Sequence, residues 1–222
     1  MRATEPPRTE IVFPDPRETP EPGIVAVGSD FRAGTLLQAY RRGIFPWPHG
    51  PHVLWFSPDP RAILPLEHEL HWSRSLRRTL RKHPFEVTVD EAFTEVMKSC
   101  GSTRDATWIT PSLARGYTTL HGLGWAHSVE VWERHGEERE LVGGIYGVAI
   151  GSLFAGESMF HTRTDASKIA FATLAERLRR NGFTLFDVQV MSDHLASLGC
   201  IDVSRNEYLR RLGHALDVDA VF

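Results

Sequence analysis

Phe-Ala-Gly-Glu-Ser-Met-Phe at positions 154–160 and Phe-Asp-Val-Gln-Val at positions 186–190 are two apolar segments that each carry polar side chains. Burying a carboxylate or an amide without a partner costs several kcal/mol, so apolar strands normally exclude Glu, Asp and Gln. We therefore interpret Glu157, Asp187 and Gln189 as parts of a functional site. Their apolar surroundings indicate a substrate with an apolar side chain.

The sequence around these segments predicts an α+β fold. Apolar stretches predict strands over residues 126–132, 140–150, 151–154 and 184–190. Asp165 and Ser167 stand at N-cap positions for a long helix that ends at Arg180, just before an Asn-Gly pair. Helices come first, a mainly antiparallel sheet follows, and further helices flank its last strand.

The N-terminal region has a different composition. Its first 22 residues contain six prolines and predict an extended or poorly ordered start. A short helix over residues 35–42 and an aromatic loop over residues 44–48 follow. We expect a small N-terminal domain over residues 1–64 and a larger domain over residues 65–222.

Composition limits the class of protein. With 222 residues, 41% of them hydrophobic, the chain can bury a substantial core. A net charge of -3 argues against a dedicated non-specific nucleic-acid binder, although it allows a local basic patch. Two lone cysteines fit a reduced compartment, and no apolar run reaches the ~20 residues that span a bilayer. We expect a soluble, cytoplasmic protein that does not bind membranes.

Asp187 and Gln189 are two positions apart on a predicted strand. A regular strand would place both side chains on one face, with Phe186, Val188 and Val190 on the other. A carboxylate beside an amide can hold that amide in one orientation, because Gln has both a donor and an acceptor. The alternative is a strand pair whose polar groups bind a nearby loop.

Glu157 follows Gly156, which permits a bulge or a close backbone approach. The structural alternative is an ion pair between Glu157 and Arg163 or Lys168. The joint occurrence of this segment and the 186–190 segment favours the functional interpretation.

A predicted helix over residues 73–82 carries arginines on its polar faces. They could contact nucleic-acid phosphates, or they could form a solvated helix face; the residues are Arg74, Arg77, Arg78 and Arg81. The sequence contains no H-E-x-x-H or C-x-x-C motif, and we expect neither a metal nor a cofactor.

Five blocks in order resemble the leucyl/phenylalanyl-tRNA–protein transferase family, over residues 13–212. They are LLQAYRRGIFPW at 36–47, WFSPDPR at 55–61, AHSVEVW at 126–132, GESMF at 156–160 and HLASLG at 194–199. The resemblance implies a small N-terminal domain and a C-terminal domain with an acetyltransferase-like (GNAT) fold. It also implies transfer of Leu or Phe from charged tRNA to an N-terminal Arg or Lys, which marks the acceptor for N-end rule degradation.

The resemblance also implies residue roles. Asp187 and Gln189 match the catalytic pair of the family, and Glu157 matches its third polar active-site residue. The pocket for the transferred side chain matches Ile145, Met159, Phe171, Leu174, Leu178 and Phe186. The aromatic positions near the tRNA 3′ adenosine or the peptide match Tyr40, Trp47, Trp108 and Tyr117.

These roles suggest a mechanism. The attacking α-amino group has a pKa of about 8, so a useful fraction is neutral near pH 7 without a strong base. We expect Asp187 to orient the Gln189 amide, Gln189 to align amine and ester, and Glu157 to hold the amino group of the aminoacyl moiety.

Two rival functions stay open: an acyl-CoA-dependent N-acetyltransferase, and a non-catalytic module that binds peptide N-termini or tRNA. We expect a monomer, because no heptad pattern or large apolar stripe stands out in the sequence.

Overall fold

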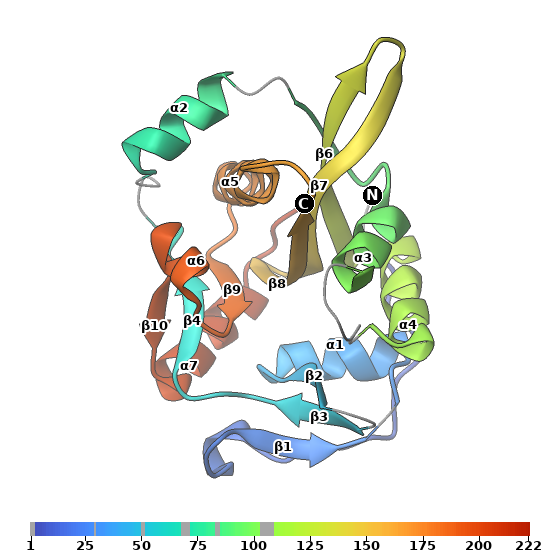
Figure 1. The fold of residues 1–222 in the computed structure, drawn as a ribbon. Coiled ribbons are helices and arrows are strands. Elements are labelled where there is room, and N and C mark those ends of the chain that lie inside the picture. The colour runs from blue at the N-terminus through green and yellow to red at the C-terminus, as the bar shows by residue number, and fades with distance from the viewer. Residues whose placement is uncertain (1–2, 29, 50–51, 68–71, 83–84, 103–108) are drawn as a thin grey trace.

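The computed structural model describes residues 3–28, 30–49, 52–67, 72–82, 85–102 and 109–222. Two sheets and the helices around them form the fold (Figure 1). No helix in these ranges is long and apolar enough to cross a membrane. Trp108, one of the predicted substrate-binding residues, lies outside the described residues.

The smaller sheet has the strand order β1-β3-β2, with antiparallel pairs. Its strands are β1 (Ile24–Val27), β2 (Phe45–His49) and β3 (His52–Phe56), and the helix α1 (Ala33–Arg41) lies between β1 and β2 in sequence. The aromatic loop predicted at 44–48 is wrong, because this segment is strand β2. Its two prolines are tolerated because β2 is an edge strand, where a missing N–H need not break a ladder.

The larger sheet has the strand order β10-β4-β9-β8-β7-β6-β5. Only β8 and β9 pair in parallel among its neighbours, which confirms the predicted α+β class with a mainly antiparallel sheet. Its strands are β4 (Arg61–Leu64), β5 (Glu86–Val89), β6 (Ala126–His135), β7 (Glu138–Ile150), β8 (Leu153–His161), β9 (Leu185–Gln189) and β10 (Ile201–Val203).

Helices cover both faces of this sheet (Figure 1). On one face α5 packs on β6, β7 and β8. On the other face α3 packs on the same three strands and α4 packs on β6, because alternate residues such as Ile145 and Tyr146 enter opposite cores. The remaining helices are short or peripheral. The bounds are α2 (Arg74–Lys82), α3 (Phe93–Ser102), α4 (Pro111–Gly122), α5 (Ala166–Arg180), α6 (Asp193–Ser197) and α7 (Arg205–Leu216).

Two sequence predictions change at the strand after β7. The strand predicted at 151–154 is too short, because β8 continues to His161 through the polar segment. Asp165 does precede α5, but its side chain accepts hydrogen bonds from Thr79 and Lys168 and makes no cap bond to the helix. The left-handed backbone of Asp165, with φ 67°, accompanies this different role.

The N-terminal region shares its core with the rest of the chain. Phe13 is buried against Trp55, and α1 packs on α4 within the same hydrophobic core as Tyr146. Strand β4 pairs with β9 and β10, so sheet membership would place a boundary before Arg61. The division into residues 1–64 and 65–222 stays a prediction.

Candidate active site

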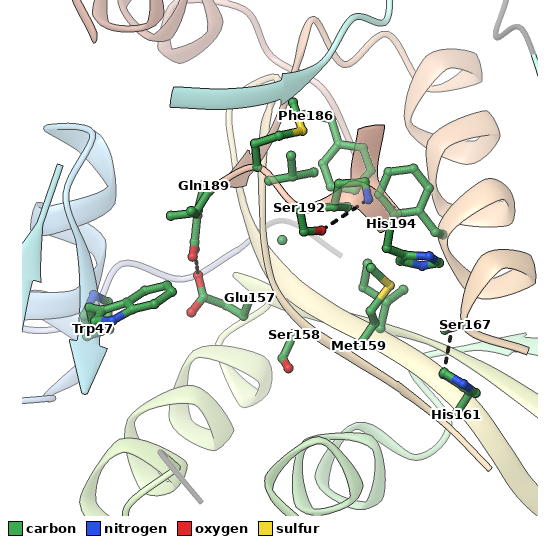
Figure 2. Close-up of a pocket in the computed structure, with 18 residues that line it drawn as sticks. Trp47, Glu157, Ser158, Met159, His161, Ser167, Phe186, Gln189, Ser192 and His194 are labelled. Carbon is green, nitrogen blue, oxygen red and sulfur yellow. Dashed lines mark hydrogen bonds between the residues drawn. The ribbon is translucent and has the colours of Figure 1, made fainter. Parts of the chain in front are cut away.

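A cavity of about 600 Å³ opens where β8 and β9 separate (Figure 2). The two strands pair only over Leu153–Ala155 and Leu185–Asp187, and beyond these residues they diverge. Side chains from β2, β7, β8, α5, β9 and α6 line the space. The two polar segments of the sequence therefore come together on one cavity.

Asp187 lies behind this cavity, in a buried ion pair. Its two carboxylate oxygens accept hydrogen bonds from Arg61 Nε at 2.8 Å and Arg61 Nη2 at 2.6 Å, and the Tyr208 hydroxyl donates a third at 2.8 Å. Only 1% of either charged side chain is exposed. Burial opposes the charge on Arg61, but the carboxylate beside it raises the guanidinium pKa above its ordinary value. The guanidinium is therefore charged, and the bidentate contact fixes the two side chains in place.

Gln189 lies at the end of β9 and faces the cavity. Its backbone N–H donates to Asp187 Oδ1 at 2.9 Å, and its Nε2 donates to Glu157 Oε1 at 2.6 Å. The structure thus differs from the prediction that Asp187 orients the amide: Asp187 holds the backbone of Gln189, and Glu157 holds its side chain.

The predicted shared face for Asp187 and Gln189 is also wrong, for a reason of backbone geometry. Asp187 pairs with Ile63 and Gln189 with Ala62, two consecutive residues, so the ladder is shifted at Val188. Gln189 has φ 69°, a left-handed value outside the range of regular extended strands. The alternation fails at this point, and Phe186 and Val188 line the cavity in place of Asp187.

Glu157 lies on a bulge of β8. Its neighbours Gly156 and Ser158 pair with the consecutive residues Gly147 and Tyr146, which leaves Glu157 as the extra residue. Bulges of this kind re-aim a side chain, and they are common beside active sites. The bulge that Gly156 permitted in the sequence is therefore present, and it turns Glu157 toward the cavity (Figure 2).

The carboxylate of Glu157 accepts hydrogen bonds from neutral donors, and among the described residues no cation pairs with it. Tyr117 donates to its Oε2 at 2.6 Å, and the hydroxyls of Tyr117 and Tyr40 are 2.6 Å apart. Burial raises the Glu157 pKa to about 7, and the negative Asp187 adds to this rise, while hydrogen bonds from Tyr117, Tyr40 and Gln189 oppose it. Glu157 therefore changes its charge near neutral pH.

The structural alternative for Glu157 is wrong. Arg163 pairs with Glu133 and Glu140, and Lys168 pairs with Asp165.

Four of the six predicted pocket residues line the cavity. Phe171 and Phe186 stack with ring centroids 5.2 Å apart, and Ile145 and Met159 complete an apolar end. Leu174 and Leu178 are fully buried in the core around α5 and are not among the lining residues. They support the apolar wall from behind.

The predicted aromatic residues separate into two groups. Trp47 lines the cavity and is 40% exposed at its opening. Tyr40 and Tyr117 are fully buried behind Glu157, where burial raises the pKa of both phenols well above the ordinary value. They contact the Glu157 carboxylate and do not line the cavity.

Several residues of the site were not among the predicted site residues. His161, Ser167 and His194 line the cavity, and burial lowers the pKa of the His194 imidazole. Arg61 was predicted only as the last residue of a family block, although an arginine followed by the apolar Ala62–Leu64 is the same kind of misplaced charge as Asp187. That signal would have identified Arg61.

Helix α2 presents its arginines to solvent. Leu76 and Trp72 are buried against the core around α5, while all four predicted phosphate-binding arginines are exposed. Within the described ranges, no carboxylate forms an ion pair with any of these four. They are Arg74, Arg77, Arg78 and Arg81.

Among the described residues, one group of side chains could offer metal ligands, at Glu133, His135 and Glu140. Both of its carboxylates are already paired with Arg163, and the group lies on the β6–β7 hairpin away from the cavity.

Comparison with known proteins assigns the family. The protein-family model described as leucyl/phenylalanyl-tRNA protein transferase matches residues 63–213. The family model of the N-terminal domain of the same proteins matches residues 29–59. The chain belongs to this family. It is an aminoacyltransferase, and the family predicted from the five sequence blocks is confirmed. This membership favours the transferase over the acyl-CoA-dependent and non-catalytic alternatives.

Curated relatives match nearly the whole chain. The leucyl/phenylalanyl-tRNA–protein transferase of Pseudoalteromonas atlantica is 48% identical over 92% of this chain and 88% of its own length. The one of Azotobacter vinelandii is 50% identical over 88% of this chain and 86% of its own. Among solved structures, the chain resembles FemX, with a TM-score of 0.47 and 16% identity, covering 70% of this chain and 64% of that one. It also resembles a tandem GNAT protein, with a TM-score of 0.40 and 16% identity over 86% of this chain and 60% of that one.

Proposed function

We propose that this transferase moves Leu or Phe from the 3′ end of charged tRNA to the N-terminal Arg or Lys of an acceptor protein. The transfer forms a peptide bond and marks the acceptor for degradation by the N-end rule. The observation that carries the proposal is the cavity of about 600 Å³, in which an apolar wall adjoins the Glu157–Gln189 pair.

Binding of the charged tRNA uses two surfaces in this proposal. The apolar end formed by Phe171, Phe186, Ile145 and Met159 holds the Leu or Phe side chain. Trp47 lies at the opening, where its ring can stack on the terminal adenine. The arginines of α2 bind phosphates of the acceptor stem, a contact that carries no base sequence information.

The chemical step exchanges an ester for an amide. The neutral acceptor amine attacks the ester carbonyl, the C–N bond forms, and the C–O bond to the ribose breaks. The amine gives up one proton and the ribose oxygen takes one, so the step is balanced without an external acid. Because the amine pKa is about 8, enough neutral amine exists near pH 7.

Gln189 and Glu157 align the reactants. The Nε2 group of Gln189 is held by Glu157, which fixes the amide plane and directs its free groups toward the attacking amine and the ester. Ionised Glu157 holds the amino group of the aminoacyl moiety. Such positioning can lower the free-energy barrier of a reaction by several kcal/mol. Asp187 has no contact with the substrates and acts through the backbone of Gln189.

The test of this function combines the purified chain with Phe-tRNA and a peptide that begins with Arg. We expect a product heavier by one Phe residue, and no product from the same peptide with an acetylated N-terminus. Acetyl-CoA in place of Phe-tRNA should leave the peptide unchanged. Acetylation of the peptide, or no Phe transfer from a correctly charged tRNA, would overturn the proposal.

The selectivity of the pocket has its own test. Size alone discriminates by ~1–3 kcal/mol per methylene, so Met-tRNA should be a weaker donor. Val-tRNA and Ile-tRNA should be poor donors, because their branched Cβ does not suit a deep, apolar end. Equal rates for Val-tRNA and Leu-tRNA would remove the pocket assignment.

We also propose that the enzyme acts as a monomer in the cytoplasm. Light scattering after gel filtration should give a mass near 25.0 kDa. A mass near twice this value would replace the monomer with a dimer.

A further inference from the structure

Each nitrogen atom of the Arg61 guanidinium group donates a hydrogen bond. Nε and Nη2 donate to the two oxygens of Asp187, and Nη1 donates to the carbonyl oxygen of Gly43 at 3.0 Å. The plane lies between two aromatic rings, with Cζ 4.5 Å from the centroid of Phe45 and 4.3 Å from that of Tyr208. The side chain therefore joins the turn after α1 to strand β9 and helix α7.

The same Asp187 oxygen serves Arg61 and the active-site backbone. Oδ1 accepts from Arg61 Nε at 2.8 Å and from the N–H of Gln189 at 2.9 Å. Gln189 has a left-handed backbone, which residues other than Gly rarely adopt. Its conformation therefore needs support from other groups. The bond from its N–H to a fixed carboxylate gives that support.

From Gln189 the hydrogen bonds continue to α1, the helix that precedes Gly43. Gln189 binds Glu157, Glu157 binds Tyr117, and the Tyr117 hydroxyl meets that of Tyr40 on α1. Gly43, whose carbonyl receives Arg61, follows α1 by two residues. The polar groups of the site thus form a ring that closes on α1, and Arg61 is a buried member of it that does not line the cavity.

We propose that Arg61 is a positioning residue for the transfer reaction: by fixing Asp187, it holds the backbone of Gln189 in the conformation that directs the Gln189 amide to Glu157. Tyr208 is a second positioning residue, since its hydroxyl binds the other Asp187 oxygen. Neither side chain lines the cavity, so neither touches the substrates. The inference rests on the role proposed for Gln189.

Lysine cannot replace Arg61 in this position. Its ammonium group keeps the charge, but it is a point donor that cannot span both carboxylate oxygens and the Gly43 carbonyl. Arg61→Lys should therefore keep a cation beside Asp187 but lose the bidentate contact that fixes the carboxylate, and the geometry of Gln189 should be less firmly held.

The experiment measures kcat and KM with Phe-tRNA and an Arg-initiated peptide for Arg61→Lys, Gln189→Ala and the double variant. We expect Arg61→Lys to lower kcat 10- to 100-fold and to change KM for Phe-tRNA by less than about threefold. If Arg61 acts through Gln189, the double variant should be no more than about threefold slower than Gln189→Ala alone.

Arg205 supplies a matched control. It is a second buried arginine, 8% exposed, whose guanidinium binds the carbonyl oxygens of Ser57 and Thr19 and has no contact with Asp187. Arg205→Lys should change kcat by less than about threefold at a temperature where both lysine variants are folded. An equal loss of kcat in Arg205→Lys and Arg61→Lys would overturn the positioning role.

Tyr208→Phe covers the case in which Arg61→Lys does not fold. It removes one hydrogen bond to Asp187 and keeps the ring against Arg61. We expect kcat to fall about 3- to 10-fold in the wild-type background and to stay unchanged in the Gln189→Ala background.

Other outcomes separate the two proposals. Multiplying effects of Arg61→Lys and Gln189→Ala would overturn the inference about Arg61 and leave the role of Gln189 intact. A wild-type rate for Gln189→Ala alone would overturn the role of Gln189, and with it the path from Arg61. A wild-type kcat for Tyr208→Phe would overturn the role of Tyr208 as a positioning residue. If Arg61→Lys is unfolded, the same result would overturn the whole inference.

Discussion

Asp187 and Glu157 are two carboxylates on neighbouring strands, and their surroundings are opposite. Asp187 is 1% exposed and is paired with Arg61 through two hydrogen bonds. Glu157 faces the cavity, and its partners are the neutral groups of Tyr117 and Gln189. Gln189 connects the two, since its backbone binds Asp187 and its side chain binds Glu157.

The difference shows how the surroundings of a carboxylate determine its role in the protein. A buried carboxylate that is bound by a bidentate cation is a fixed structural group. Removing either charge would leave the other unpaired in the protein interior, which is strongly destabilising. A buried carboxylate with neutral donors keeps a pKa near neutrality and stays free to meet a cationic substrate group.

The largest effect should come from Arg61→Met, which leaves Asp187 buried without its cation. We expect the free energy of unfolding at pH 7 to fall by about 3–5 kcal/mol. Urea denaturation at pH 7 measures the loss. Glu157→Gln is the matched comparison and should not be less stable than wild type by more than about 1 kcal/mol, because it removes an uncompensated charge. Equal losses in the two variants would remove the contrast.

The second effect is a pH dependence that belongs to Glu157. Its pKa is about 7 in the folded chain, against an ordinary value of 4.5, so the folded state binds the proton more tightly. Stability from this proton is fully present below pH 4.5 and is lost as pH rises to about 7. Relative to Glu157→Gln, the wild-type free energy of unfolding should fall by about 3 kcal/mol at most across that window.

Urea denaturation of both proteins from pH 4.5 to 8 checks this difference. Parallel stability curves for wild type and Glu157→Gln would show that Glu157 titrates at its ordinary pH. The value of kcat/KM for Phe-tRNA should rise over the same range in wild type, because the ionised carboxylate holds the aminoacyl amino group.

Gln189→Ala tests the link between the two carboxylates. We expect turnover to fall about 10- to 100-fold, since an aligning group is lost, with little change in the affinity for charged tRNA. Single-turnover transfer and filter binding measure the two quantities separately. A near-wild-type single-turnover rate would exclude Gln189 from the reaction.

The smallest effect extends the contrast between paired and unpaired charges to the surface. Replacing Arg77 and Arg81 of α2 with Ala should make the slope of log affinity for tRNA against log salt shallower by about 2. Replacing Arg210 and Arg211 of α7, which already pair with Glu207, is the control and should leave the slope unchanged. An unchanged slope in the α2 variant would make this helix an ordinary solvated face.

Sequence reasoning found the polar residues of the site but not their arrangement. Misplaced polarity identified Glu157, Asp187 and Gln189, and ordered blocks identified the family. The shared face of Asp187 and Gln189 was wrong because the two-residue rule assumes regular extended backbone, whereas the ladder shifts at Val188 and Gln189 has φ 69°. Tyr40 and Tyr117 matched aromatic positions of the family, but only packing shows that both lie behind Glu157.

The sequence by itself determined the family, the α+β class and the identity of three polar residues in apolar segments. Only the tertiary structure decided that Asp187 pairs with a cation and that the described partners of Glu157 are neutral. The cation of Asp187 is Arg61, 126 positions earlier, and the phenol of Glu157 is Tyr117, 40 positions earlier. The charge state of a buried group depends on what lies within a few ångströms in space, and sequence spacing does not encode contacts over such separations.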